Sequence, residues 1–300
     1  MKGLDYRWLA ALDAIVHQKS FEKAAEQLCI TQSAVSQRIK QLEKLVAQPL
    51  LIREQPPKPT ETGKKLLSLY QKVKLLEQET FPDLDLTTIN RPLIVSLAVN
   101  ADSLATWFLP AISPLLESNS IELNLLVEDE TRTLLKLKNG EVVGALSTHE
   151  KPMIGCECTY LGDVVYRCVA SPSFVDKYFK QGVTREAIMR APAVSFDQHD
   201  EMHQQYLFET FNLSAGEWIK HTVRSSESFV FLSKRGVAYS LIPEIQVKQE
   251  LASGELMDIY PAHTIIRPLY WHHWALESDI LAKMTDNIIR YGRSTFGTYE

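Results

Sequence analysis

The chain opens with short segments of helical periodicity separated by helix-capping residues, and this pattern restricts the fold more than any other feature. Apolar residues recur at helical spacing from Tyr6 to Lys19, where the first helix is expected to stop. Ser20 is a favoured N-cap for a second helix over Phe21–Leu28. Ala24 and Ala25 in that helix would allow close approach of a neighbouring helix.

A third helix is predicted after a turn at Cys29-Ile30, capped by Thr31 and running from Gln32 to about Val46. Its inward face is predicted to hold Ala34, Val35, Ile39, Leu42 and Leu45. Its outward face holds Gln32, Ser33, Ser36, Gln37, Arg38 and Lys40. Small hydrogen-bonding side chains of this kind are typical of a helix that enters the major groove, although an ordinary solvated face has a similar composition.

A proline-rich stretch follows, from Arg53 to Thr62, and it is too restrained for a helix. We expect it to form a wing that carries Arg53, Lys58, Thr60 and Thr62 toward the DNA backbone or minor groove. From Gly63 to about Glu79 the pattern becomes helical again, with an apolar stripe at Leu66, Leu69, Tyr70, Val73 and Leu76. This helix is interpreted as a dimerisation arm, with packing onto its own domain as the alternative.

Charge is distributed unevenly along the chain. The formal net charge is −5 overall, yet it is +6 over residues 1–75 and −11 over residues 76–300. A basic N-terminal segment attached to an acidic remainder indicates that only the N-terminal segment binds a polyanion.

Four motifs in this region resemble the N-terminal domain of LysR-type transcriptional regulators: Phe21–Leu28, Thr31–Glu43, Pro49-Leu50-Leu51 and Pro59–Gly63. The resemblance implies an all-α winged helix-turn-helix domain over 1–62 and a linker helix over 63–90. The DNA-binding residues expected from the helix pattern and the resemblance are Phe21, Thr31, Gln32, Ser33, Ser36, Gln37, Arg38, Lys40, Arg53, Lys58, Thr60 and Thr62.

Beyond a linker predicted at Pro82–Pro92, strands and helices alternate as in an α/β sheet with crossover helices. The expected strands are Leu93–Val99, Ile121–Val127, Val142–Ser147, Val164–Ala170, Ala193–Asp197, His221–Arg224, Val237–Leu241 and Leu269–Ala275. The expected helices are Ser103–Glu117, Glu130–Asn139, Pro172–Phe179, Glu201–Asn212, Ser226–Lys234, Pro243–Glu250 and Ser278–Phe296.

This part resembles the effector domain of the same family, which is a pair of lobes like those of periplasmic binding proteins. The resemblance implies an effector-binding domain over 91–300. Its first lobe would comprise about 91–162 and 267–300, and its second lobe about 163–266.

Ligands of such folds bind at the carboxyl ends of strands, between the lobes and near helix N-termini. Four junctions fit, at Asn100–Ser103, Ser147-Thr148, Phe196-Asp197 and Ser225–Glu227. Each taken alone is better explained as an N-cap, but four that face one cleft indicate a binding site. The expected effector-binding residues are Asn100, Asp102, Ser103, Glu128, Asp129, Ser147, Thr148, Asp197, Ser225, Ser226 and Glu227.

The tracts Leu97–Trp107 and Leu126–Thr133 resemble the branch of the family that controls basic amino-acid export, whose effectors are lysine and arginine. A cationic side chain needs a desolvated carboxylate partner, and the acidic members of the predicted set are the candidates. Sequence does not choose among Asp102, Glu128, Asp129, Asp197 and Glu227.

No metal or cofactor is expected. The cysteines Cys29, Cys156, Cys158 and Cys168 form no C-x-x-C pair and are interpreted as small core residues. In Trp271-His-His-Trp274 strand alternation would place His272 and His273 on opposite faces, which is poor geometry for chelation and favours packing.

The sequence also argues against catalysis, because it contains no nucleotide-binding glycine loop, metalloprotease motif or nucleophile elbow. We therefore expect a cytoplasmic transcription regulator whose partners are an operator duplex, a small effector, RNA polymerase and further copies of itself as a dimer or tetramer. A two-lobed solute-binding protein and an architectural DNA-binding protein without ligand response remain alternatives. The N-terminus lacks the apolar region of a secretory signal, and no apolar run is long enough for a membrane span.

Overall fold

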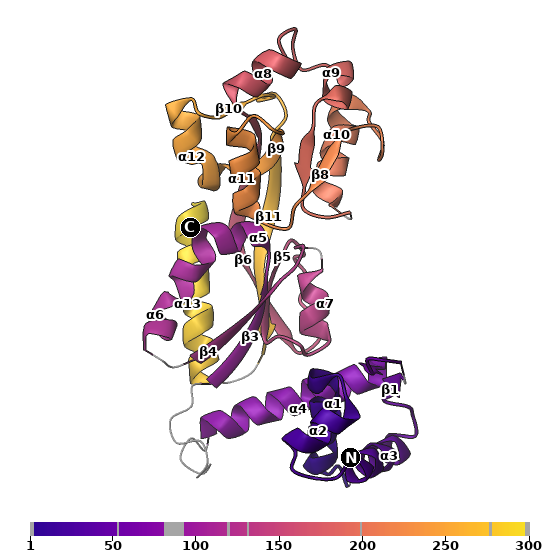
Figure 1. Cartoon of the computed structure of the whole chain (residues 1–300). Helices are drawn as coiled ribbons and strands as arrows, with labels where there is room; N and C mark the ends of the chain where they lie inside the picture. The colour runs from indigo at the N-terminus through magenta and orange to yellow at the C-terminus, as the bar shows by residue number, and fades with distance from the viewer. Residues whose placement is uncertain are drawn as a thin grey trace. The chain divides into compact units, whose positions relative to one another are not determined.

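The computed structural model describes residues 3–52, 54–80, 93–118, 121–130, 132–198, 200–275 and 278–297, without the side chains of residues 78–80 and 93. The chain divides into two compact units, one made mostly of residues before Leu97 and the other mostly of residues from Leu97 onward. The first consists of helices with a small hairpin, and in the second helices flank a sheet (Figure 1).

The first unit begins with three helices: α1 (Tyr6–Gln18), α2 (Phe21–Gln27) and α3 (Gln32–Val46). The predicted caps are confirmed, because the Ser20 hydroxyl accepts from Lys23 N and the Thr31 hydroxyl from Ala34 N. α1 ends at Gln18, because the C-cap Lys19 has a left-handed φ of 54° that breaks the helical hydrogen-bond pattern.

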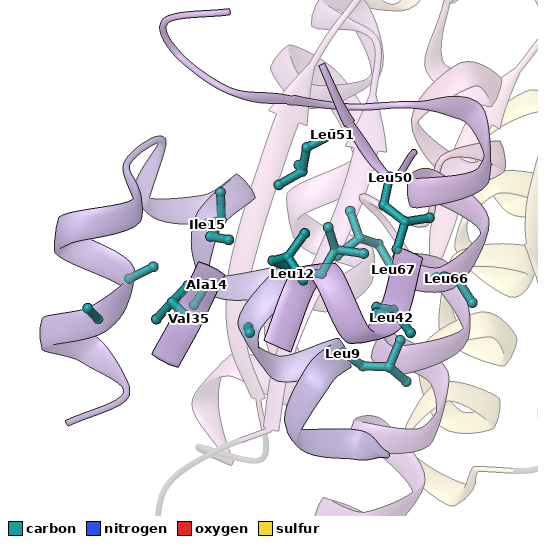
Figure 2. Packing of buried hydrophobic residues seen from close by; sticks show 14 residues of the cluster. Leu9, Leu12, Ala14, Ile15, Val35, Leu42, Leu50, Leu51, Leu66 and Leu67 are labelled. Carbon is teal, nitrogen blue, oxygen red and sulfur yellow. The ribbon is translucent and has the colours of Figure 1, made fainter. Parts of the chain in front are cut away.

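An apolar core joins these helices to the following arm (Figure 2). Leu9, Leu12 and Ile15 of α1 are fully buried, as are Val35 and Leu42 of α3. The core is completed by Leu50, Leu51, Leu66 and Leu67. Close packing of these side chains fixes α3 on the unit and leaves its opposite face free of core contacts.

The predicted wing is an antiparallel hairpin of β1 (Leu51–Ile52) and β2 (Lys58–Pro59), followed by the long helix α4 (Glu61–Thr80). A Cβ atom at Gly63 would collide with the carbonyl oxygen of Leu50, so only glycine permits this close approach between α4 and the hairpin.

Some expectations for this unit are wrong in detail. Leu45 is 40% exposed because the last turn of α3 directs Val46, and not Leu45, toward the core. Cys29 is exposed in a left-handed turn and is not a core residue. In the α4 stripe Leu66 is buried, but Leu69 and Leu76 are exposed, since the helix turns Leu67 and Leu75 inward instead. The linker predicted at 82–92 lies outside the described residues.

The second unit is built on a sheet with the strand order β10-β6-β11-β5-β3-β4, and β9 also pairs with β6. Strands β6 and β11 are long and antiparallel, whereas β3 and β5 are parallel. The strands are β3 (Leu93–Val99), β4 (Ile121–Val127), β5 (Gly144–Ser147), β6 (Cys156–Ala170), β9 (Ser240–Pro243), β10 (Met257–Asp258) and β11 (Ile265–Trp274). A separate parallel pair is formed by β7 (Ala193–Ser195) and β8 (Lys220–Thr222).

Helices cover this framework. They are α5 (Ala101–Ser103), the π-helical segment η1 (Leu104–Phe108), α6 (Leu109–Glu117), α7 (Thr133–Lys138), α8 (Pro172–Tyr178), α9 (Arg185–Arg190), α10 (Glu201–Phe211), α11 (Ser226–Lys234), α12 (Glu244–Ser253) and α13 (Asp279–Phe296).

The predicted two-lobed architecture is confirmed. Strands β6 and β11 run from one lobe into the other, with β3, β4 and β5 in the first lobe and β7, β8 and β9 in the second (Figure 1). The second lobe has its own cores, one centred on Phe174, Tyr206 and Tyr239 and another on Phe229 and Val247.

Helix α9 and strand β10 were not predicted, and the strand expected over Val237–Leu241 begins only at Ser240. The helix expected from Glu130 begins at Thr133, because Thr133 donates its hydroxyl to Leu146 O and is fully buried there. Glu130 therefore lies in the loop before α7.

The Trp271–Trp274 strand packs as predicted. The rings of Trp271 and His273 stack on one face at 6.3 Å, and His272 on the other face lies 3.3 Å from Cys158 Sγ. Among the described residues no group of histidine, cysteine or acidic side chains has the arrangement of a metal site.

Candidate functional sites

The outward face of α3 presents small polar side chains, as predicted. Gln32, Ser33, Gln37 and Lys40 are exposed, and none of them is used in the core. The Thr31 hydroxyl accepts from Ala34 N at 3.2 Å and lies 2.9 Å from Ser33 Oγ, so the helix start is held by the cap that the sequence predicts.

A hollow of about 810 Å³ lies beside this face in the first unit. Its walls come from the start of α2, the α3 face and the wing, so three segments converge on one concave surface. It is lined by Lys19, Ser20, Phe21, Glu22, Gln32, Ser36, Ile39, Lys40, Glu43, Leu51, Ile52, Glu54, Gln55, Pro56 and Pro57. The structure thus brings together four of the predicted DNA-binding residues, namely Phe21, Gln32, Ser36 and Lys40.

The other described residues of the predicted set are not part of the walls of the hollow, and some of them serve the fold. Lys58 pairs with Glu54 at 3.1 Å, at the tip of the wing. The hydroxyl of Thr60 donates to Pro49 O and accepts from Gly63 N, and that of Thr62 donates to Gln48 Oε1, so both also stabilise the start of α4. Thr31, Ser33, Gln37 and Arg38 do not line the hollow. Arg53 lies outside the described residues.

The second unit contains a smaller cavity, of about 60 Å³, between its two lobes. Acidic groups dominate its lining. The lining residues are Asn100, Ala101, Asp102, Glu128, Asp129, Glu130, Tyr166, Phe196, Asp200, Met202, Ser226, Phe229 and Leu241.

Both carboxylate oxygens of Asp102 accept hydrogen bonds in this cavity. Tyr166 donates its hydroxyl to one carboxylate oxygen at 2.8 Å, and Ser226 donates to the other at 2.6 Å. Burial raises the pKa of Asp102, and the two hydroxyl donors oppose that rise because they favour the ionised form.

Glu130 shares the cavity with Asp102. Burial, with the nearby charges of Asp102 and Asp129, raises the pKa of Glu130 to about 8, while Arg267 acts in the opposite direction. Several carboxylates enclosed together disfavour one another's ionisation, so this cavity favours an incoming cation.

Two further polar groups complete the lining. Asp200 accepts hydrogen bonds from Ser195 Oγ, Phe196 N and His203 N, which fixes it at the start of α10. Asn100 is 7% exposed, and its Oδ1 atom has no hydrogen-bond partner among the described residues. A buried acceptor without a partner is costly, and a ligand donor would relieve that cost.

Five of the predicted effector residues therefore line the cavity: Asn100, Asp102, Glu128, Asp129 and Ser226. The other six do not. Ser103 is buried in α5, Ser147 donates to Glu130 O, and Asp197 pairs with Arg132. Ser225 is the N-cap of α11 and donates to the exposed Glu227, and Thr148 follows β5.

Eight lining residues are not among the predicted effector residues, although Ala101 and Phe196 fall within predicted junctions. They are Ala101, Glu130, Tyr166, Phe196, Asp200, Met202, Phe229 and Leu241. Some carried a usable signal, since Glu130 adjoins two predicted acidic residues and Asp200 precedes a predicted helix as a natural N-cap. Tyr166 carried none, because it lies in the interior of a predicted strand.

Models of two domain families match the chain. A bacterial regulatory helix-turn-helix protein of the lysR family matches residues 6–64, and a LysR substrate binding domain matches residues 94–275. The chain belongs to the LysR family. It is a DNA-binding transcription regulator with an effector-binding domain, as the sequence motifs predicted.

Curated relatives of this LysR-family chain include the HTH-type transcriptional regulator ArgP of Photobacterium profundum, which is 59% identical over 98% of both chains. ArgP of Vibrio cholerae is 54% identical over 98% of this chain and 99% of its own length. In the described part of the regulator, no helix combines the length and apolarity needed to cross a membrane.

Solved structures agree with this assignment. ArgP from Mycobacterium tuberculosis superposes with a TM-score of 0.84 at 34% identity, covering 96% of this chain and 97% of that one. Full-length LysG from Corynebacterium glutamicum with bound effector Arg has a TM-score of 0.78 at 34% identity, covering 97% and 99%.

Proposed function

We propose that this regulator senses a basic amino acid, lysine or arginine, in the acidic cavity and thereby controls genes such as one for a basic amino-acid exporter. The carrying observation is the group of carboxylates around Asp102 and Glu130 between the lobes. The names of the ArgP relatives and the arginine bound to LysG support the same ligand class.

The chemistry of the cavity favours a cation over a neutral ligand. A guanidinium or ammonium group placed near Asp102 and Glu130 would replace mutual repulsion by attraction in a poorly hydrated space. The amide oxygen of Asn100 would accept a hydrogen bond from the same ligand, because ammonium and guanidinium groups only donate hydrogen bonds.

For operator binding we infer that the α3 face and the hollow beside it meet the duplex. Gln32 and Ser36 would reach base edges in the major groove, and Lys40 would contact phosphate. The net charge of +6 over residues 1–75 supports this surface, because neutralising phosphates supplies most of the sequence-independent affinity.

We further infer that the regulator acts in the cytoplasm as a homodimer or tetramer, without catalysis, and that it engages RNA polymerase. Leu69 and Leu76 are exposed one heptad apart on α4, which is the spacing of an apolar seam between paired helices. Ligand binding would then change the arrangement of paired DNA-binding domains, provided that the ligand prefers one arrangement.

Titration calorimetry on the full chain tests the ligand. We expect lysine or arginine to bind, and the neutral isosteres norleucine and citrulline to bind at least about 100-fold more weakly, because the carboxylates would lose their ionic partner. Asp102→Asn should remove that preference, whereas Asp176→Asn on the exposed face of α8 should not. Equal affinity for citrulline and arginine would contradict the proposal.

A further inference from the structure

The cavity is too small for its proposed ligand in this conformation. Its volume of about 60 Å³ is well below the roughly 300 Å³ at which ligand pockets begin. A basic amino acid therefore enters only after the two lobes separate, and contacts that join the lobes must break during entry.

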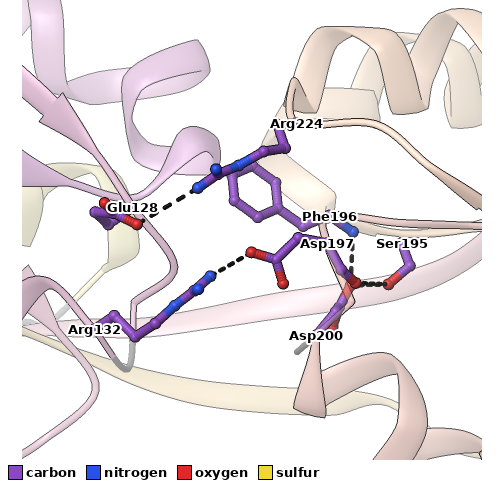
Figure 3. A network of polar contacts seen from close by, with 7 residues as sticks. All are labelled: Glu128, Arg132, Ser195, Phe196, Asp197, Asp200 and Arg224. Carbon is purple, nitrogen blue, oxygen red and sulfur yellow. Dashed lines mark hydrogen bonds and ion pairs between the residues drawn. The ribbon is translucent and has the colours of Figure 1, made fainter. Parts of the chain in front are cut away.

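Two arginine–carboxylate pairs join the lobes beside the cavity (Figure 3). Arg132, in the first lobe after β4, donates to Asp197, which follows β7 in the second lobe, at 2.5 Å. Arg224 of the second lobe reaches back to Glu128 of the first at 3.5 Å, and its guanidinium lies 5.4 Å from the centre of the Phe196 ring.

The first pair is the stronger of the two. The side chain of Asp197 is 14% exposed and that of Arg132 is 33% exposed, so solvent screens this pair less than a surface pair. Arg224 is 56% exposed and its bond is longer, so its contribution is smaller. Glu128 and Phe196 line the cavity, whereas Arg132 and Asp197 do not.

We propose that the Arg132–Asp197 pair, assisted by Arg224–Glu128, is a clasp between the lobes that sets how fast the effector enters and leaves. Arg132 and Asp197 are thus positioning residues that do not touch the effector. This inference rests on the proposed function for its ligand, and it replaces the sequence-based assignment of Asp197 as an effector contact.

The clasp forms whenever the lobes are together. Arg132 and Asp197 lie outside the cavity lining, so the lining side chains can rearrange around an effector while the pair stays intact. Removing it destabilises both closed forms by the same amount and leaves the open form unchanged. Association and dissociation rates should therefore rise together, whereas the equilibrium affinity should hardly change. Loss of a direct effector contact would instead raise the dissociation rate alone.

Stopped-flow binding of lysine and arginine to the full chain distinguishes these cases. Arg132→Gln and Asp197→Asn should each raise both rate constants by roughly three- to ten-fold, with Kd changed by less than about two-fold. The exchanged pair Arg132→Asp with Asp197→Arg should restore slow rates. Arg185→Gln is the matched control, because Arg185 pairs with Glu217 at 3.0 Å within the second lobe.

Hydrogen–deuterium exchange without any amino acid tests the clasp independently of the proposed ligand. Arg132→Gln should accelerate exchange at the cleft-facing residues 100–103 and 225–228, and Arg185→Gln should not. Unchanged exchange and unchanged rates would overturn the clasp. A tenfold rise in Kd with an unchanged association rate would overturn it in favour of direct contact, while accelerated exchange without lysine or arginine binding would refute only the proposed ligand.

Discussion

The Tyr166 hydroxyl donates a 2.8 Å hydrogen bond to Oδ2 of Asp102, and this bond ties strand β6 to the short helix α5 at the effector cavity. Ser226, at the start of α11, donates to the second oxygen of the same carboxylate. An acidic group of the first lobe is therefore held by two donors of the second lobe, so its protonation and the closure of the cleft are physically connected.

Tyr166→Phe should weaken binding of lysine and arginine about ten-fold near neutral pH, since a hydrogen bond to a charged group contributes roughly 1.5–3 kcal/mol. Loss of the donor raises the pKa of Asp102 further, so part of the affinity should return at higher pH. Calorimetry at two pH values measures both effects. Tyr178→Phe in α8 is the control, and equal losses in the two variants would argue against a role for the hydroxyl at Tyr166.

Effector binding should be coupled to proton release from Glu130. Its pKa is raised to about 8, so it is mostly protonated at neutral pH, and a bound cation favours its ionised form. Affinity should rise with pH below about 8, by at most about ten-fold per pH unit, and then level off. Calorimetry in buffers of different ionisation enthalpy counts the protons released, and Glu130→Gln should remove the slope.

The same group should make folding stability depend on pH. Because the folded-state pKa of Glu130 lies above its ordinary value of 4.5, the folded chain holds a proton that the unfolded chain has lost between those values. This contribution to stability is fully present below about pH 4.5, falls as pH rises toward 8, and is absent above it. In thermal melts the melting temperature of Glu130→Gln relative to that of the wild type should increase as pH rises through this range. A difference in melting temperature that does not change with pH would rule the linkage out.

On the DNA side, Ser36→Ala and Lys40→Ala should behave differently. Ser36 should contact base edges of the operator. Its loss should therefore reduce the binding free energy by about 1 kcal/mol or more on operator DNA and by little on random DNA. Lys40→Ala should weaken binding to both and lower the salt slope by about one counterion. Anisotropy titrations at several salt concentrations measure these quantities. If Ser36→Ala lowered the affinity for operator and random DNA equally, Ser36 would not be one of the residues that contact bases.

Short-range sequence patterns were enough to predict the helices of the first unit. The N-caps Ser20 and Thr31 and the buried faces of α1 and α3 follow from spacing and hydrogen-bonding chemistry within a few residues. Errors appear where a distant segment decides burial. Leu45 is exposed because α3 directs Val46 toward the core in its last turn, and α4 turns Leu75 inward in place of Leu76.

The residues of the cavity depended more on tertiary structure than on local sequence. Asp102 and Ser226 were expected from strand–helix junctions, but Tyr166 and Glu130 became visible only when β6 and the loop before α7 were placed together. Asp197 has the same local signal as Asp102, yet it pairs with Arg132, 65 residues earlier in the chain. Local sequence does not distinguish a carboxylate that faces a cavity from one that is neutralised by a distant arginine.

Sequence patterns determined the helix-turn-helix, the alternating strands and helices of the α/β domain and the acidic character of the effector region, because caps, periodicity and charge act over a few residues. The two lobes were expected from the resemblance to the family. Only the tertiary structure decided which carboxylates share one cavity, which of them is held by Tyr166 and Ser226, and which pair joins the lobes. Those outcomes depend on how strands β6 and β11 bring distant segments together, and burial then sets the protonation of each group.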